Sequence, residues 1–133
     1  MPGLWDHLDE LASQDRLHAP EEVLQEISSQ DDDLAAWVHE RAGKIIVPST
    51  RAVLLEARSV LADHPKLTML GKGRGLADPF VIALASIKGC HVVTHEQGGS
   101  IDKPRIPFVC QDRQVPSMDV LGVIRAEGLR FTR

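Results

Sequence analysis

Two acidic residues stand at the ends of consecutive elements in the stretch from Ala77 to Glu96. Asp78 precedes Pro79 at the start of an apolar helical pattern, and Glu96 follows the β-branched run Val92–Thr94. Open α/β sheets keep their sites at the carboxyl ends of parallel strands. Clustered carboxylates prefer hard cations such as magnesium or manganese, which activate water and stabilise charge during phosphodiester cleavage.

Other reactive residue types lack the spacing that their chemistry requires. His95-Glu96 does not begin a zinc-protease motif, because Gly99 stands where the second histidine belongs. Neither Cys90 nor Cys110 has a metal-binding or redox spacing, and the chain has no Gly-x-Ser-x-Gly elbow. The six histidines show no ligand spacing either. Carboxylates therefore remain the candidates for chemistry.

Each candidate acid also has a simpler interpretation. An Asp before a Pro-initiated helix is more often only a helix cap, so Asp78 is expected to cap the helix that Pro79 opens. Glu96 by itself suits a solvated loop. Glu26 lies at the edge of a helical apolar face, which marks it only mildly. The residues alone leave the function open.

Charge is distributed unevenly along the chain. Residues 1–70 contain 6 basic and 13 acidic side chains, a net charge of −7, whereas residues 71–133 contain 9 and 6, a net charge of +3. Such polarity suits two differently solvated faces, and it is also compatible with a phosphate-bearing partner on the second half. The loop 71–75 fits neither a Walker loop nor a dinucleotide fingerprint, although Lys72 and Arg74 could contact phosphates.

The elements that must position these residues alternate between helix and strand. Helical patterns cover Leu4–Ala12, a segment from Pro20, a segment from Asp31 to near Gly43, Ser49–Ala62, the segment after Asp78 up to Gly89, and Met118–Glu127. Strand patterns cover Arg16–Ala19, Lys44–Val47, Val92–Thr94 and a short segment from Val115. This alternation predicts an α/β fold with a mostly parallel sheet.

Length and composition indicate one ordinary domain. The chain has 133 residues, of which 43% are hydrophobic and 26% charged. These values are typical of a globular domain with a real core. No segment resembles a transmembrane span or a signal peptide, so a cytoplasmic protein without a membrane partner is expected. The two cysteines are then expected to be buried apolar residues.

The order of these segments resembles the PIN domain family. The likeness rests on Ala77–Ala83, which reads Ala-Asp-Pro-Phe-Val-Ile-Ala, followed by Val92–Glu96, which reads Val-Val-Thr-His-Glu. Pro2–Asp6, the acidic run before Leu34–Val38, and the ending Gly128–Phe131 are similar to one bacterial PIN-like subfamily. The likeness extends over essentially the whole chain and depends on order and spacing rather than on any single motif.

The resemblance implies a single PIN-like domain over residues 1–133 with a three-layer α/β/α fold. It implies a ribonuclease that uses Mg²⁺ or Mn²⁺ on an RNA substrate. PIN domains of this kind often serve as toxins held silent by an antitoxin protein. By position, Asp78, Glu26 and Glu96 would be the catalytic and metal-binding acids, with Glu96 in place of the commoner Asp. The implied strands are Arg16–Ala19, Lys44–Val47, His91–Thr94 and Gln114–Ser117.

One part of the PIN pattern is absent from the sequence. PIN domains begin with a strand that ends in Asp-x-Asn or Asp-x-Ser, and this chain starts at Met1 without it. The pattern is therefore N-terminally truncated, and weak or no nuclease activity is expected. The first strand would lie between Arg16–Ala19 and His91–Thr94, so these either pair directly or accept a strand from another chain. A homo-oligomer or a partner-dependent protein is expected.

Two other functions remain open at this stage. One is a catalytically inactive PIN-like module that binds RNA or a protein. The other is a small-molecule or nucleotide binder on a generic doubly wound sheet. Convergence of Asp78, Glu26 and Glu96 would favour the metal-dependent enzyme over both.

Overall fold

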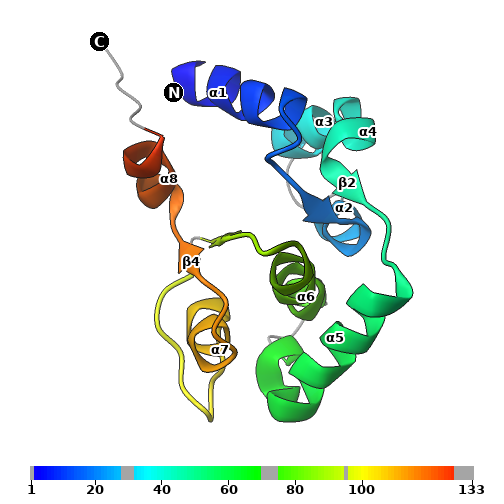
Figure 1. Cartoon of the computed structure of the whole chain (residues 1–133), viewed down its shortest axis with the longest axis vertical. Helices are drawn as coiled ribbons and strands as arrows, with labels where there is room; N and C mark the ends of the chain where they lie inside the picture. Colours follow the sequence, from blue (N-terminus) through cyan, green and yellow to red (C-terminus); the bar gives the residue numbers. More distant parts are fainter. Residues whose placement is uncertain (1, 28–31, 70–74, 95, 128–133) are drawn as a thin grey trace. The chain divides into compact units, whose positions relative to one another are not determined.

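A computed structural model describes residues 2–27, 32–69, 75–94 and 96–127 (Figure 1). Contacts divide the chain into two compact units, of which the first ends at Pro48 and the second begins at Ser49. The single domain expected from chain length stays a prediction. The predictions for Asp31, Lys72, Arg74, His95 and 128–131 lie outside the described residues. Within the described ranges, no helix has both the length and the apolar character needed to cross a bilayer.

Helices dominate both units. The elements follow the order α1 (Pro2–Ser13), β1 (Ala19–Pro20), α2 (Glu21–Ile27), α3 (Asp32–Glu40), α4 (Ala42–Ile45), β2 (Ile46–Val47), α5 (Arg51–Asp63), the 3₁₀ helix η1 (Pro65–Thr68), α6 (Asp78–Lys88), β3 (Val92–Val93), α7 (Ile106–Asp112), β4 (Ser117–Met118) and α8 (Val120–Ala126). The fold is mixed α/β, as the alternating pattern predicts.

The strands are short and form two separate parallel pairs. In the first unit, β1 pairs with β2 through Ala19 opposite Ile46, and in the second unit β3 pairs with β4 through Val92 opposite Ser117. All four described strands lie within or beside the predicted strand segments. Each described strand pair lies within one unit, so direct pairing of the segments 16–19 and 91–94, which would join the two units, stays a prediction.

The segment predicted as strand Lys44–Val47 begins as a helix. Lys44 and Ile45 belong to α4, where the N–H groups of both residues donate to the Arg41 carbonyl at 2.8 and 3.0 Å. This turn places Ile45 in the interior, and only Ile46 and Val47 remain extended. Local hydrogen bonding thus outweighs the β-branched run for half of the segment.

An aromatic and ionic cluster joins α1 to the end of α3 in the first unit. The rings of Trp5 and Trp37 lie 5.1 Å apart, and the Arg41 guanidinium lies 4.4 Å from the centre of the Trp37 ring. Arg41 also hydrogen-bonds both carboxylate oxygens of Asp9, which raises the pKa of the guanidinium. The cation stacked on an aromatic ring therefore has its own counter-ion.

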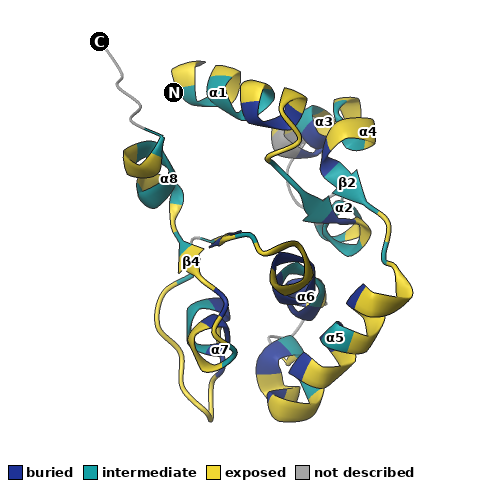
Figure 2. Ribbon diagram, in the orientation of Figure 1, coloured by how far each residue is buried: buried dark blue, intermediate teal, exposed yellow. Residues whose placement is uncertain are grey.

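The second unit contains a continuous apolar core. Its buried side chains include Val60 from α5, Leu67 from η1, Ile82 from α6, Val92 from β3 and Val109 from α7 (Figure 2). Four successive residues of α6, 82–85, are buried, so this helix is covered on more than one side, as its apolar sequence predicts. Parallel strands of this kind require cover from helices.

Residues with defined backbone roles begin and end these helices. Thr50 accepts a hydrogen bond from the Val53 N–H at the start of α5, and Asp119 does the same for Gly122 in α8. Gly89 ends α6 with φ of 70°, which is the left-handed conformation predicted for that glycine. Helix ends are therefore well specified by local sequence in the second unit.

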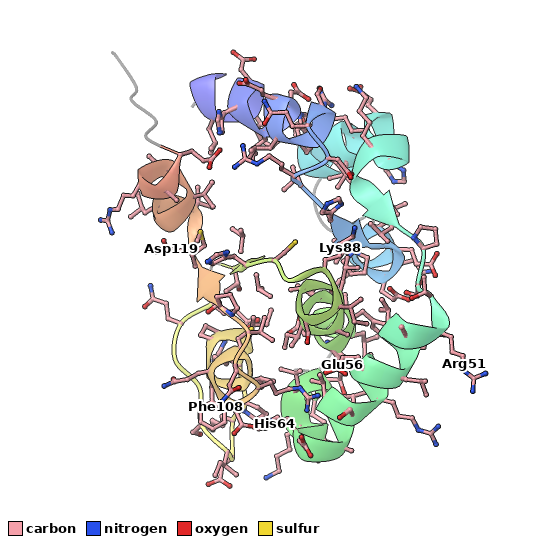
Figure 3. The ribbon with its side chains drawn as sticks, in the orientation of Figure 1. Arg51, Glu56, His64, Lys88, Phe108 and Asp119 are labelled. Atoms are coloured by element: carbon pink, nitrogen blue, oxygen red, sulfur yellow. The ribbon has the colours of Figure 1, made fainter. Side chains whose placement is uncertain are left out.

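Ionic contacts connect α7 to α5. Arg113, which follows α7, donates to Glu56 at 2.7 Å, Asp63 at 2.8 Å and the Ser59 hydroxyl at 3.1 Å. Beside them, Nε2 of the buried His64 ring lies 2.8 Å from a carboxylate oxygen of Asp112, and the ring packs edge-on against Phe108. Figure 3 labels Glu56, His64 and Phe108 in this region. These contacts hold α7 and the residue that follows it against α5 and His64.

Candidate functional site

Asp78 is a buried carboxylate at the first position of α6. Its backbone N–H donates to the Gly75 carbonyl at 3.1 Å, and the residue is only 8% exposed. The prediction that Asp78 caps this helix is wrong, because Ala77 occupies the cap position and no side chain caps the helix. Asp78 instead places a negative charge in the first helical turn, where the helix dipole stabilises it.

Glu96 follows β3, and its backbone is fixed there by Thr94. The Thr94 N–H donates to the Met118 carbonyl at 2.9 Å, and the Glu96 N–H donates to the Thr94 hydroxyl at 3.1 Å. The Glu96 side chain is 24% exposed. Glu96 is therefore not the solvated loop residue that it resembles in isolation.

The carboxylate of Glu96 has one oxygen that is fully buried. This oxygen, Oε2, accepts no hydrogen bond from any residue that the structure describes, and it lies 3.9 Å from Nη1 of Arg105. That separation allows attraction between the charges but exceeds hydrogen-bond length. A buried carboxylate oxygen without a donor is costly, and a cation or a donor from a ligand would satisfy it.

Asp78 and Glu96 flank two elements that are consecutive in the chain. Helix α6 contacts β3, and the three residues 89–91 connect them. Asp78 is the first residue of α6, and Glu96 follows β3 at the carboxyl end of the parallel pair β3–β4.

Glu26 belongs to the first unit. It is a half-buried residue of α2 in the first unit, whereas Asp78 and Glu96 belong to the second unit. Among the described residues, no group of three His, Cys, Asp or Glu side chains is arranged to hold a metal ion. The convergence of all three acids therefore stays a prediction.

The donor chemistry of Glu96 suits magnesium. This ion keeps several waters and binds proteins through as few as one or two carboxylates, with substrate phosphates completing its shell. The buried Oε2 atom of Glu96 fits such an ion, because an oxygen with unsatisfied lone pairs is the donor type that hard cations select.

Arg105 is the residue at this site that the sequence did not indicate. It immediately precedes α7 and is about half exposed. Only the folded loop after Glu96 brings it beside that carboxylate, and no spacing rule for known motifs covers the pair. A guanidinium next to a candidate metal-binding acid can bind a phosphate oxygen of a substrate through two N–H groups.

Comparison with known proteins gives one family match. Residues 1–131 match the model of a family described as a domain of unknown function, DUF4411. No curated protein and no solved structure matches the chain.

Proposed function

This chain belongs to the DUF4411 family, and we propose that it is a metal-dependent ribonuclease of the PIN-like class. The observation that carries this proposal is the carboxyl end of β3, where Glu96 has a buried oxygen without a donor and lies beside Arg105. Buried Asp78 begins the helix that packs on this strand. Carboxylates for a cation and a guanidinium for a phosphate are the groups that phosphodiester cleavage requires.

The proposed fold is the three-layer α/β/α arrangement of PIN domains. The second unit supports it through the order α6, β3, α7, β4, α8, in which helices precede and follow two parallel strands. A parallel pair connected through a helix follows the usual βαβ rule. Glu26, in α2 after β1, is proposed as the third acid of the same site.

Each residue has a distinct role in the proposed reaction. Asp78 and Glu96 would hold Mg²⁺ or Mn²⁺, which when bound supplies activated water and charge stabilisation. Arg105 would bind a non-bridging phosphate oxygen and orient the RNA backbone next to the two acids. Thr94 would keep Glu96 in place through its hydroxyl, which accepts the Glu96 N–H at 3.1 Å.

The proposed activity is weak. Affinity for a divalent ion falls when fewer negative ligands are present, and the proposal assigns only two acids of the second unit to the ion. Regulation by an antitoxin protein, which would bind over such a site, is part of the same proposal. RNA is the proposed substrate because the resemblance to PIN domains implies it, and a diester phosphate suits one guanidinium beside metal-binding acids.

Cleavage of a short labelled RNA in Mn²⁺ and in chelator tests the function. We expect slow cleavage in Mn²⁺ only, reduced at least about tenfold by Asp78→Asn and by Glu96→Gln, because each change removes one charge of the metal site. Glu10→Gln in α1 is the matched control and should leave the rate unchanged. Metal-dependent cleavage that survives both site substitutions contradicts the proposal, as does an absence of any cleavage in Mn²⁺.

A further inference from the structure

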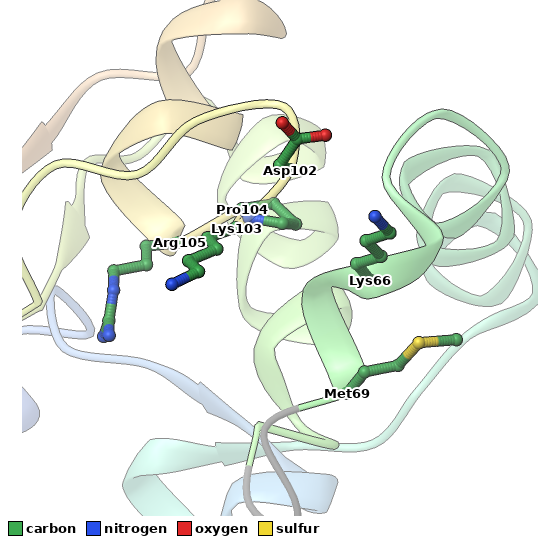
Figure 4. Close-up of a pocket in the computed structure, with 6 residues that line it drawn as sticks. All are labelled: Lys66, Met69, Asp102, Lys103, Pro104 and Arg105. Carbon is green, nitrogen blue, oxygen red and sulfur yellow. The ribbon is translucent and has the colours of Figure 1, made fainter.

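A cavity in the second unit is lined by six residues, of which three are cationic. Its volume is about 330 Å³, and Figure 4 shows Lys66 on one side opposite the loop that precedes α7. The lining residues are Lys66 and Met69, from η1 and its end, and Asp102, Lys103, Pro104 and Arg105, from the loop. A cavity of this size is within the range that holds small ligands such as a nucleotide.

The backbone that carries these cations is well fixed on both sides. Leu67 of η1 is completely buried in the core, which anchors the turn that bears Lys66. In the loop, the Ser100 N–H donates to the Lys103 carbonyl at 3.1 Å, and the Lys103 N–H donates to the Ser100 hydroxyl at 3.2 Å. Pro104 is buried. The loop is therefore a closed turn rather than an extended linker.

Gly99 allows this loop to fold back onto the start of α7. Its φ of 109° is rarely adopted by residues with a side chain. A Cβ atom there would also lie 2.8 Å from the Arg105 backbone nitrogen and 2.9 Å from Cβ of Phe108. This close approach fixes the backbone of Arg105, which lines the cavity and lies 3.9 Å from Glu96.

The charge of the lining suits a doubly charged anion. Lys66, Lys103 and Arg105 contribute three positive charges, and Asp102 contributes one negative charge. The net excess is two positive charges. A phosphate monoester carries about −1.5 to −2 at pH 7, whereas a diester within a nucleic acid chain carries a single charge. The lining thus matches a monoester better than a diester.

We infer that this cavity binds a phosphate monoester, either on a free nucleotide or at the phosphorylated end of an oligonucleotide. Arg105 and the two lysines bind the phosphate oxygens, and Arg105 contributes a planar pair of donors. The inference rests on the cavity and its charges. It stands whether or not the protein cleaves RNA, and it requires no metal ion.

Glu96 opposes this binding in the free protein. Its carboxylate lies 3.9 Å from Arg105 and attracts the guanidinium that the phosphate needs. Removing that charge should therefore strengthen phosphate binding, whereas it should weaken cleavage under the proposed function. Glu96→Gln distinguishes the two ideas because it changes the two readouts in opposite directions.

The test measures binding of three labelled probes in chelator, which prevents metal-dependent cleavage. The probes are a nucleoside 5′-monophosphate, a tetranucleotide with a 5′-phosphate and the same tetranucleotide with a 5′-hydroxyl. We expect both phosphorylated probes to bind at least about tenfold more tightly than the hydroxyl probe, since one charge-assisted contact is sufficient for that difference. If the 5′-phosphorylated tetranucleotide binds more tightly than the mononucleotide, the natural ligand is the end of an oligonucleotide. If the mononucleotide binds more tightly, the natural ligand is a free nucleotide.

Matched triple substitutions identify the cavity as the binding site. Lys66→Ala, Lys103→Ala and Arg105→Ala together should weaken binding of the phosphorylated probes at least about tenfold. The control combines Arg51→Ala, Arg58→Ala and Lys88→Ala, which remove equal charge from exposed positions of the same unit and should change binding less than about threefold. Glu96→Gln should tighten binding about twofold to fivefold.

Three results would overturn the inference. The first is equal affinity for the phosphorylated and hydroxyl tetranucleotides, because the cavity would then not recognise a monoester. The second is an equal loss of binding in the two triple variants, which would mean that overall charge alone attracts the probes. The third is that the control triple variant, shown by circular dichroism to be folded, binds none of the phosphorylated probes.

Discussion

Asp78 shows how far a single residue could be interpreted from sequence. Its position before Pro79 correctly indicated a helix start, because proline is tolerated there without loss of a hydrogen bond. The cap role was wrong by one position, and burial of the carboxylate was not predictable. Local sequence specifies where a helix begins within a residue or two, whereas burial depends on the loop and strand packed beside it.

Cys110 provides a prediction at this scale. The thiol is completely buried, and burial raises its pKa to about 11. Stability that is present below the ordinary thiol pKa should therefore be lost as pH rises toward 11, because the unfolded chain ionises first. When the pH is raised from about 7.5 to about 10.5, the free energy of unfolding of the wild type should fall by about 2 kcal/mol more than that of Cys110→Ala. Urea unfolding at each pH measures both values.

The thiol at position 90 is the internal reference for Cys110. Cys90 is only half-buried, so an alkylating reagent at pH 8 should modify it while Cys110 remains unmodified in the folded protein. Mass spectrometry of the digested protein gives both extents of reaction. Equal modification of the two cysteines in the folded state would contradict the buried position of Cys110.

At the level of elements, helices were predicted better than strands. The apolar spacing of α5 and α6 and the glycine after α6 specify those helices locally. The four described strands contain only two residues each, since neighbouring residues such as Lys44 and Ile45 satisfy their backbone groups in a helical turn. Strand length depends on partners far away in sequence, which periodicity does not reveal.

Ionic contacts between α5 and α7 could not be predicted for the same reason. Arg113 is separated from Glu56 by 57 residues, and it is largely buried, with its side chain 14% exposed. Arg113→Met keeps the aliphatic stem but leaves Glu56 and Asp63 without their cation. We expect a loss of about 2 kcal/mol in the free energy of unfolding at pH 7.

A matched substitution separates this effect from simple loss of charge. Arg58→Met removes an exposed cation from α5, the helix that also carries Glu56 and Asp63. It should change the unfolding free energy by less than about 0.5 kcal/mol. Urea titrations of both variants give the comparison. If Arg113→Met were as stable as Arg58→Met, the contacts with Glu56 and Asp63 would contribute nothing measurable.

For the whole molecule, the sequence predicted an α/β fold but not that the proposed site residues belong to two different units. Asp78 begins α6 and Glu96 follows β3, the next element in the chain, so the pattern of helix and strand was sufficient to place each acid at the end of its element. Glu26 belongs to the other unit, and only the family resemblance joined it to them. Lys66 and Arg105 line one cavity because η1 and the loop before α7 fold together, which no local pattern encodes.

The two short sheets support a prediction about assembly. Val92 of β3 and Thr94, which follows this strand, donate to the Pro116 and Met118 carbonyls on the β4 side, so alternation directs the Val93 backbone groups to the opposite edge. Val93 is also 47% exposed. Because an open parallel edge readily accepts a strand, we expect self-association or dependence on a partner. Light scattering after gel filtration checks this, and a monomer that unfolds cooperatively would contradict it.

Binding of Mn²⁺ observed by NMR tests the proposed metal site most directly. Manganese broadens the amide signals of nearby residues, so a titration into isotope-labelled protein locates the ion without requiring cleavage. We predict that the signals beside Asp78 and Glu96 broaden first, and that Asp78→Asn combined with Glu96→Gln removes this broadening. Broadening that begins at other acids, such as Glu56 and Asp63, or that persists in the double variant, would contradict the proposed site.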